Sequence, residues 1–385
     1  MHEYIAGCIH AFSYFIEKRG KMKQRNRNAD LIRCVAVYSV LSVHFLLNSG
    51  FYSVEVQGTD MLLMCMVRSL FMVCVPLFMI LSGYLMWHKK LSRNYYKGLG
   101  KTIEIYVLAS IACLLYKKLV QGEAVTLKTA ILGILDFDAA NYAWYIEMYI
   151  CLFLMIPFFN LIWNGLQTKK EKQILILTMA AVTFLPKMLN NFNLTTEGWF
   201  FSPSVSTAYD PVVPSFFTSM YPITYYFIGA YLSEYDWKIP KRWNLLLLLL
   251  AVGIFGCYNY YRSDGGTFVW AANSTWGGEN MITALLLFTL LLHINLDRMP
   301  DRLYAVLRYI SQISLGIYLI SWIFDKIVYN AYLKPGVPVV NERWKYYGIV
   351  VPSVFLLSIA GATVLYAIRK GILVICQQLT HKRQP

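Results

Sequence analysis

The chain has 385 residues, of which 57% are apolar, 16% are aromatic and only 15% are charged, and its mean hydropathy is +0.47. A soluble domain typically carries about 25% charged residues, so the composition argues against a water-soluble enzyme and indicates that a lipid bilayer is part of the solvent. The formal net charge of +14 fits either a nucleic-acid partner or a membrane, and the positions of the charges decide between them.

Apolar stretches of about 17–25 residues, the length with which a helix crosses the hydrocarbon core, recur along the whole chain. Ten membrane spans are predicted, at 29–48, 61–86, 102–118, 142–164, 172–190, 216–233, 243–260, 280–296, 310–330 and 347–368. The third, fifth and eighth are short. The predicted fold class is therefore an all-α polytopic membrane protein.

The loops between these spans differ in charge. With the N-terminus in the cytoplasm, the cytoplasmic segments carry about three times as many Lys and Arg residues as the outer loops, as the positive-inside rule requires. Both termini are therefore predicted to be cytoplasmic, and nucleic acid is not needed to explain the basicity. The predicted division is a basic N-terminal segment (1–28), one ten-helix membrane domain (29–368) and a basic tail (369–385).

The N-terminal segment does not have the order of a signal peptide, because its apolar part, 4–16, precedes the basic run. It is either an interfacial stretch or a segment upstream of a true start at Met22. The eight cysteines are scattered without a CxxC pair, so neither a disulfide framework nor a metal site is predicted.

Ionisable side chains inside the predicted spans are site candidates, because a charge in the bilayer is costly. They are Asp30, Arg33, His44, Arg68, Glu104, Glu147, Asp325 and Lys326. Arg33 and His44 are separated by about three helical turns, a rise of about 16 Å, so they share one face of the first span. That face connects the cytoplasmic side with a histidine in the outer half of the membrane.

Arg68, Glu147 and Asp325 fall at depths similar to that of His44, and together they predict an outer vestibule. Each has a structural alternative. His44 alone is compatible with a simple interhelical hydrogen bond, Arg68 and Glu147 with a structural ion pair, and Asp325 with snorkelling to the interface. Asp30 is compatible with a helix cap paired to Arg33. The outer aromatic residues fit either a sugar-stacking surface or an interfacial belt; they are Trp199, Phe200, Phe201, Tyr209, Trp270 and Trp276.

Several motifs together resemble the third acyltransferase family of integral membrane proteins. Members typically begin with Asp-x-x-Arg and a histidine eleven residues after the arginine, which matches Asp30, Arg33 and His44 here. Further similar segments follow in the expected order. They are Val75–Tyr84 with Ser82-Gly83-Tyr84, the basic loop Arg93–Lys101, Trp144–Tyr149 through Pro157, Tyr225–Tyr231, and Ser314–Tyr318. The resemblance covers about residues 28 to 370.

The resemblance implies an O-acyltransferase that moves an acetyl group from cytoplasmic acetyl-CoA to a hydroxyl of an extracytoplasmic cell-wall or surface glycan. It implies a multi-pass protein of the plasma membrane, as in bacteria. No permanently bound cofactor is expected, and acetyl-CoA is the acyl donor. The implied catalytic residues are His44 and its essential partner Arg33. From its predicted depth in the membrane, Glu147 is expected as a third catalytic residue, which orients His44 or binds the sugar.

The two substrates are expected at opposite ends of the first span. For acetyl-CoA we expect Arg33, Arg93, Lys97 and Lys101, and an extended pantetheine arm is about as long as the rise from Arg33 to His44. For the acceptor we expect Arg68, Glu147, Asp325 and Trp144. Whether His44 is itself acylated or acts only as a base is left open by the residue pattern, as is the oligomeric state.

Two positions depart from the family pattern. The Arg-x-x-x-Arg before the third span is Lys97-Gly-Leu-Gly-Lys101 here, which keeps the charge for phosphate and loses the bidentate fork. Many relatives have a histidine just before the tryptophan of the fourth span, where this chain has Tyr142-Ala143. The rival interpretation is a secondary transporter or exporter of a glycan or small solute, although no internal repeat of the kind typical of transporters is evident.

Overall fold

The computed structural model describes residues 25–201, 209–235, 237–269 and 276–381. The structure is 77% helical, and the described residues form no β-strand, although an isolated bridge joins Glu55 and Thr267. The predicted apolar stretch 4–16, Met22 and Trp270 lie outside the described residues. The predicted all-α fold is confirmed.

The helices follow one another along the chain with short connections. They are α2 (Arg27–Ser49), α3 (Gly58–Phe71), α4 (Cys74–Met86), α5 (Arg93–Leu119), α6 (Leu127–Leu135), α7 (Trp144–Gly165), α8 (Lys169–Thr183), α9 (Leu185–Leu189), α10 (Tyr221–Tyr235), α11 (Lys241–Arg262), α12 (Gly278–Leu292), α13 (Asp301–Ile327), α14 (Lys334–Gly336) and α15 (Tyr347–His381). Shorter turns are the 3-10 helices η1 (Phe51–Ser53), η3 (Thr218–Met220) and η6 (Val340–Tyr346), and the π-helical η5 (Val328–Leu333).

Each predicted span contains a helix, and eight apolar helical stretches in the described residues are long enough to cross a membrane. The other two predicted spans correspond to α10 and α12, of 15 residues each. Most residues of both helices are buried within the protein. A helix surrounded by other helices is not required to match the full thickness of the lipid, which explains how these two remain short.

The second predicted span, 61–86, is broken into α3 and α4 at Met72 and Val73. Pro76 explains the break, because its ring removes the N–H that would bond to the carbonyl of Met72 and clashes with that carbonyl. The fifth predicted span is likewise divided at Phe184, two residues before Pro186 in α9. The short helix α6, in the predicted outer loop, was not anticipated.

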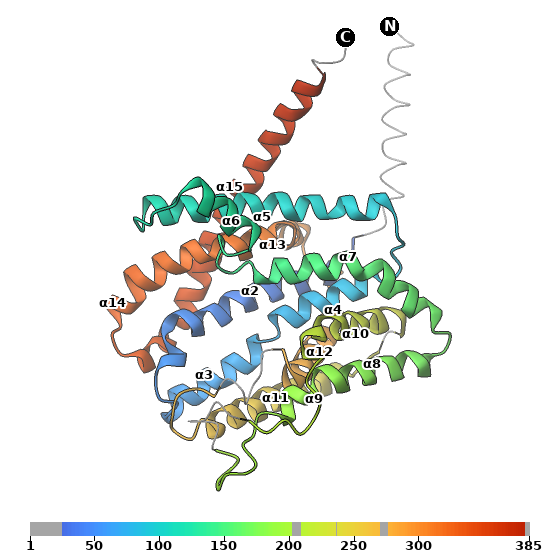
Figure 1. Ribbon diagram of the computed structural model, residues 1–385, viewed down its shortest axis with the longest axis vertical. Helices are drawn as coiled ribbons and strands as arrows, with labels where there is room; N and C mark the ends of the chain where they lie inside the picture. The colour runs from blue at the N-terminus through green and yellow to red at the C-terminus, as the bar shows by residue number, and fades with distance from the viewer. Residues whose placement is uncertain (1–24, 202–208, 236, 270–275, 382–385) are drawn as a thin grey trace.

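Helix α2 passes through the middle of the bundle (Figure 1) and packs against α3, α4, α12, α13 and α15. The last part of α15 extends away from the other helices (Figure 1), and its residues from Lys370 to Gln378 are exposed. The helices around α2 therefore position the site, and the end of α15 takes no part in it.

Helices α4 and α10 approach each other through a reciprocal pair of glycines. A Cβ atom at Gly83 would overlap the carbonyl group of Tyr226, lying 2.8 Å from its carbon, and one at Gly229 would overlap the carbonyl group of Ile80 in the same way. Only glycine allows two helix backbones to come this close. The contact fixes α4, whose opposite side faces the cavity described next.

Candidate active site

A cavity of about 890 Å³ lies beside α2 and is enclosed by residues of α2, α4, α5, α7 and α13. Arg33, Lys89 and Thr102 line it at the end where α2 and α5 begin. His44, Tyr52 and Trp144 line it near the end of α2 and the beginning of α7. One continuous cavity therefore connects the predicted donor end with the predicted acceptor end.

The face of α2 that was predicted to carry Arg33 and His44 is turned toward this cavity. Arg33 and His44 both line it, with side chains that are 31% and 12% exposed. Val40, Val43 and Leu47 complete the lining from α2. The helical periodicity of the sequence thus placed the arginine and the histidine correctly relative to each other.

Asp30 lies at the beginning of α2, one turn before Arg33, and several hydrogen bonds hold its side chain. Its buried carboxylate accepts hydrogen bonds from Arg25 at 2.7 and 2.6 Å, from Ser311 at 2.6 Å and from Tyr304 at 3.1 Å. Arg33 lies 3.4 Å from the same carboxylate. Asp30 is not the helix cap, because the side chain of Asn26 accepts from the Ala29 N–H instead.

His44 faces a carboxylate from another helix. Its Nδ1 atom lies 3.4 Å from Oδ2 of Asp325, which is fully buried on α13. The same Oδ2 accepts a hydrogen bond of 2.9 Å from the Tyr142 hydroxyl, and the Tyr142 ring lies 3.8 Å from the His44 ring between centroids. Asp325 therefore does not snorkel to the interface, and the carboxylate beside the histidine comes from α13.

The structure does not bring Glu147 to His44. Tyr145 and Tyr149 lie on the face of α7 that lines the cavity, one turn apart, and Glu147 lies between them in sequence on the opposite, exposed side. Residues two apart on a helix differ by about 200° in direction. The predicted depth of Glu147 in the membrane agrees with that of His44, but Glu147 lies on the side of α7 that faces away from the cavity.

Arg68 is also outside the cavity lining. It is fully buried, its Nε donates to the Tyr52 hydroxyl at 3.0 Å, and its guanidinium carbon lies 4.5 Å from the centre of the Phe268 ring. Tyr52 does line the cavity. Arg68 thus supports the wall of the cavity from behind, and the predicted pairing with Glu147 does not form.

The end of the cavity near His44 is aromatic. Trp144 is 43% exposed and stacks on Trp276, with ring centroids 5.8 Å apart and an interplanar angle of 26°. Both rings line the cavity, as does Asn141. Trp144 is therefore at the mouth, where the sequence predicted an acceptor contact.

The predicted donor cluster is only partly assembled. Arg93 and Lys97 are exposed on α5 and do not line the cavity, and the Lys101 ammonium lies 5.2 Å from the centre of the Tyr366 ring on α15. Glu104, one turn further along α5, pairs with Arg369 at 2.6 Å. The cation that joins Arg33 at the cavity is instead Lys89, after the end of α4.

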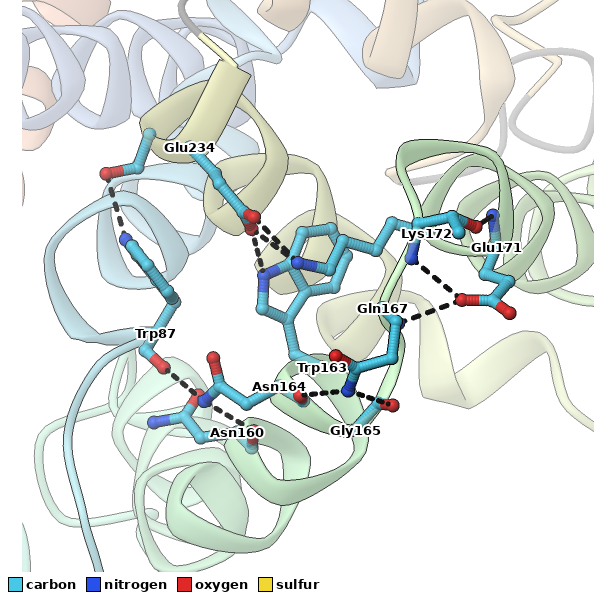
Figure 2. A network of polar contacts seen from close by, with 11 residues as sticks. Trp87, Asn160, Trp163, Asn164, Gly165, Gln167, Glu171, Lys172 and Glu234 are labelled. Atoms are coloured by element: carbon cyan, nitrogen blue, oxygen red, sulfur yellow. Dashed lines mark hydrogen bonds and ion pairs between the residues drawn. The ribbon is translucent and has the colours of Figure 1, made fainter.

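A polar network holds the segment that carries Lys89. Asn160 of α7 donates to the carbonyls of Met86 at 2.8 Å and Lys89 at 2.7 Å, and its own oxygen accepts from the Tyr226 hydroxyl at 2.6 Å. Figure 2 shows the neighbouring part of the network, in which Asn164 bonds to Asn160 and to the carbonyl of Trp87. The turn after α4 is therefore fixed to α7.

The same network contains an ion pair between Lys172 of α8 and Glu234 of α10 (Figure 2). The ammonium lies 2.7 Å from Oε1 of Glu234, and Trp163 of α7 donates to the other carboxylate oxygen at 2.9 Å. The side chain of Lys172 is 7% exposed and that of Glu234 is 25% exposed. Three helices are joined here, next to the end of the cavity that Lys89 lines.

Sequence reasoning missed Lys89, Asn160, Asn48 and Tyr142. Asn48 follows His44 by one turn on α2, which is a usable signal, and Lys89 belongs to a basic loop. The partners of Asn160 and Tyr142 lie more than 60 residues away in the chain. No local pattern indicates such contacts.

The family model described as "Acyltransferase domain", of the acyltransferase-3 type, matches residues 26–366. This match covers α2 to the greater part of α15, and therefore every helix that encloses the cavity. No curated protein matches the chain, and no solved structure does. The chain belongs to the acyltransferase-3 family, and it is a multi-pass membrane acyltransferase.

Proposed function

We propose that the protein transfers an acetyl group from cytoplasmic acetyl-CoA to a hydroxyl of an extracytoplasmic glycan, in the plasma membrane of a bacterial cell. The observation that carries the proposal is the single cavity with Arg33 and Lys89 at one end and His44 beside Asp325 at the other. The positive-inside distribution of Lys and Arg supports the same orientation, with both termini cytoplasmic.

The inner end of the cavity suits the donor. The guanidinium of Arg33 is suited to bind a phosphate group through two parallel hydrogen bonds, and the ammonium of Lys89 is suited to bind one as a point charge. In this proposal they hold the phosphates of acetyl-CoA, and Arg93, Lys97 and Lys101 contribute positive potential from the neighbouring helix. The pantetheine arm extends along the cavity past hydroxyls of its lining, among them Ser82 and Ser314, and presents the thioester near His44.

The outer end suits an acceptor hydroxyl and a base. With a proton on Nδ1, the atom that lies beside Asp325, the imidazole of His44 has a lone pair on Nε2 that accepts the proton of the hydroxyl. The hydroxyl oxygen attacks the thioester carbonyl, the C–S bond breaks, and the proton passes from Nε2 to the sulfur of CoA. The products are the glycan ester and free CoA. Trp144 and Trp276 offer a flat apolar surface against which a sugar ring stacks.

The test uses the purified full-length chain reconstituted in lipid vesicles. Acetyl-CoA should raise the melting temperature of the wild type in a saturable way. In Arg33→Gln and in Lys89→Gln, the acetyl-CoA concentration that gives half of this shift should be about tenfold higher. With an acceptor glycan present, His44→Ala and Asp325→Asn should lower kcat for CoA release by about 100-fold or more.

Two outcomes would overturn the proposal. Folded wild-type protein that acetyl-CoA does not stabilise at any concentration would favour the transporter interpretation. A His44→Ala variant with near-normal turnover would remove the histidine from the chemistry. Glu147→Gln is the matched control for Asp325→Asn, because its carboxylate is exposed on the other side of α7, and we expect nearly unchanged turnover.

A further inference from the structure

Tyr142 lies in the turn before α7, and two helices hold it from different directions. Its hydroxyl donates to Oδ2 of Asp325 on α13 at 2.9 Å and accepts from the Asn48 amide on α2 at 3.1 Å. Its backbone carbonyl accepts a hydrogen bond from the hydroxyl of Tyr318, which also lies on α13. The side chain and the backbone of one residue are thus fixed to α13 at two points.

The turn itself is built to present this residue. Asn141 has a φ of 50°, a left-handed conformation that asparagine tolerates better than most residues. The Asn141 N–H bonds to the carbonyl of Asp138 at 3.0 Å. Because the chain reverses here, the Tyr142 ring lies against the His44 ring, with centroids 3.8 Å apart and planes inclined by 36°.

We propose that Tyr142 is a positioning residue for the reaction, which fixes the carboxylate of Asp325 and the ring plane of His44 so that Nε2 faces the cavity. The inference rests on the proposed function of His44 as the base. Tyr142 acts through Asp325 and does not itself exchange a proton with the substrate.

The geometry beside His44 explains why the Asp325 carboxylate needs a further group to hold it in place. His44 Nδ1 lies 3.4 Å from Oδ2 without a well-directed hydrogen bond, and Oδ1 of Asp325 has no hydrogen-bond partner among the described residues. A carboxylate held at one contact of this length is free to rotate away from the imidazole. The Tyr142 hydroxyl, with support from Asn48 at 3.5 Å, keeps Oδ2 on the side of Nδ1.

The other titratable groups near the pair come from separate elements. Tyr329 in η5 is buried close to Asp325, and Tyr52 after α2 and Cys74 of α4 line the same cavity. No hydrogen bond joins any of these three to His44 or Asp325 among the described residues. Tyr142 and Asn48 are thus the side chains that donate hydrogen bonds to the Asp325 carboxylate among the described residues.

The decisive variant is Tyr142→Phe, which keeps the ring on His44 and removes only the hydroxyl. We expect kcat for acetyl transfer to fall by about tenfold, the effect of one hydrogen bond to a charged group, with KM for acetyl-CoA unchanged. Combined with Asp325→Asn, the same substitution should cost less than about twofold further, because residues that act as one unit are not additive.

Tyr309→Phe is the matched control. The Tyr309 hydroxyl shares a hydrogen bond of 2.7 Å with Thr363 on the exposed side of α13 and α15, so this variant loses a bond of the same kind away from His44. A second variant, Asn48→Ala, removes the amide that holds the Tyr142 hydroxyl and should lower kcat by about threefold. The melting temperature of each variant is measured in parallel, so that a variant that unfolds is recognised.

Full activity of a folded Tyr142→Phe variant would overturn the inference while leaving the proposed function intact. An equal tenfold loss in the Asp325→Asn background would also overturn it, because Tyr142 would then act independently of Asp325. Failure of the proposed function is distinguished by the wild type, which would show no acetyl transfer in the same assay.

Discussion

Replacement of Gly83 by alanine tests the reciprocal glycine contact between α4 and α10. A Cβ atom at this position would overlap the carbonyl oxygen of Tyr226, and would lie 2.8 Å from its carbon and 3.0 Å from the Ala230 nitrogen. These are backbone atoms of α10, so no side chain is able to rotate out of the way. Ordinary contact begins at 3.4 Å, and α4 and α10 must therefore separate by more than half an ångström.

Overpacking of this kind costs about 1–3 kcal/mol, and the rigid backbone places Gly83→Ala at the upper end. For a chain of this size we expect the apparent melting temperature to fall by about 3–4 °C. Because the other side of α4 lines the cavity, turnover should fall as well, even in the fraction that remains folded.

The assay is thermal unfolding in detergent with a thiol-reactive dye, followed by acetyl transfer at a temperature where all variants are folded. Gly371→Ala is the matched control, because a Cβ there meets nothing within 4 Å and alanine stabilises a helix by about 1 kcal/mol relative to glycine. If Gly83→Ala melts at the temperature of the wild type, the reciprocal glycine contact does not hold the two helices together and the reasoning is refuted.

Three further substitutions address the ends of the cavity. Asn160→Ala frees the turn that carries Lys89 and should raise KM for acetyl-CoA by about threefold in steady-state kinetics with little change in kcat; an unchanged KM would separate this turn from donor binding. Glu234→Gln leaves the more deeply buried ammonium of Lys172 without its counter-ion and should destabilise the protein by about 3 kcal/mol. Lys172→Met should destabilise it less. Chemical denaturation measures both values, and the reverse order would contradict this account. Trp144→Ala should raise KM for the acceptor at least about fivefold without changing KM for acetyl-CoA, as a lost stacking contact of 1–3 kcal/mol predicts, and equal effects on both substrates would place Trp144 elsewhere.

The sequence predicted the parts of the fold that depend on one helix at a time. The lengths of the apolar stretches located a helix within every predicted span, and the helical period placed Arg33 and His44 on one face of α2. It did not predict that 61–86 is two helices, although Pro76 was visible, because proline inside an apolar stretch is tolerated in many membrane helices.

The identity of the carboxylate beside His44 was beyond such reasoning. Topology gives the depth of Glu147 and of Asp325 in the membrane, and both depths agree with that of His44. Depth says nothing about the direction in which a side chain leaves its helix relative to another helix. That direction depends on how α7 and α13 rotate against α2, and their packing, rather than any local pattern, selects Asp325.

The two ends of the site are linked through the register of α2 and α13. At one end Asp30 of α2 accepts a hydrogen bond from Ser311 of α13, and at the other end His44 of α2 lies beside Asp325 of α13. Each of these steps along its helix is fourteen residues, about four turns and roughly 21 Å, so two parallel helices meet twice through the same pair of faces. A slip of either helix by one residue would separate both pairs together. The position of Arg33, which shares the Asp30 carboxylate, and the position of His44 are therefore set by one helix pair, and this is how the chain keeps Arg33 and His44 at a fixed separation along the cavity.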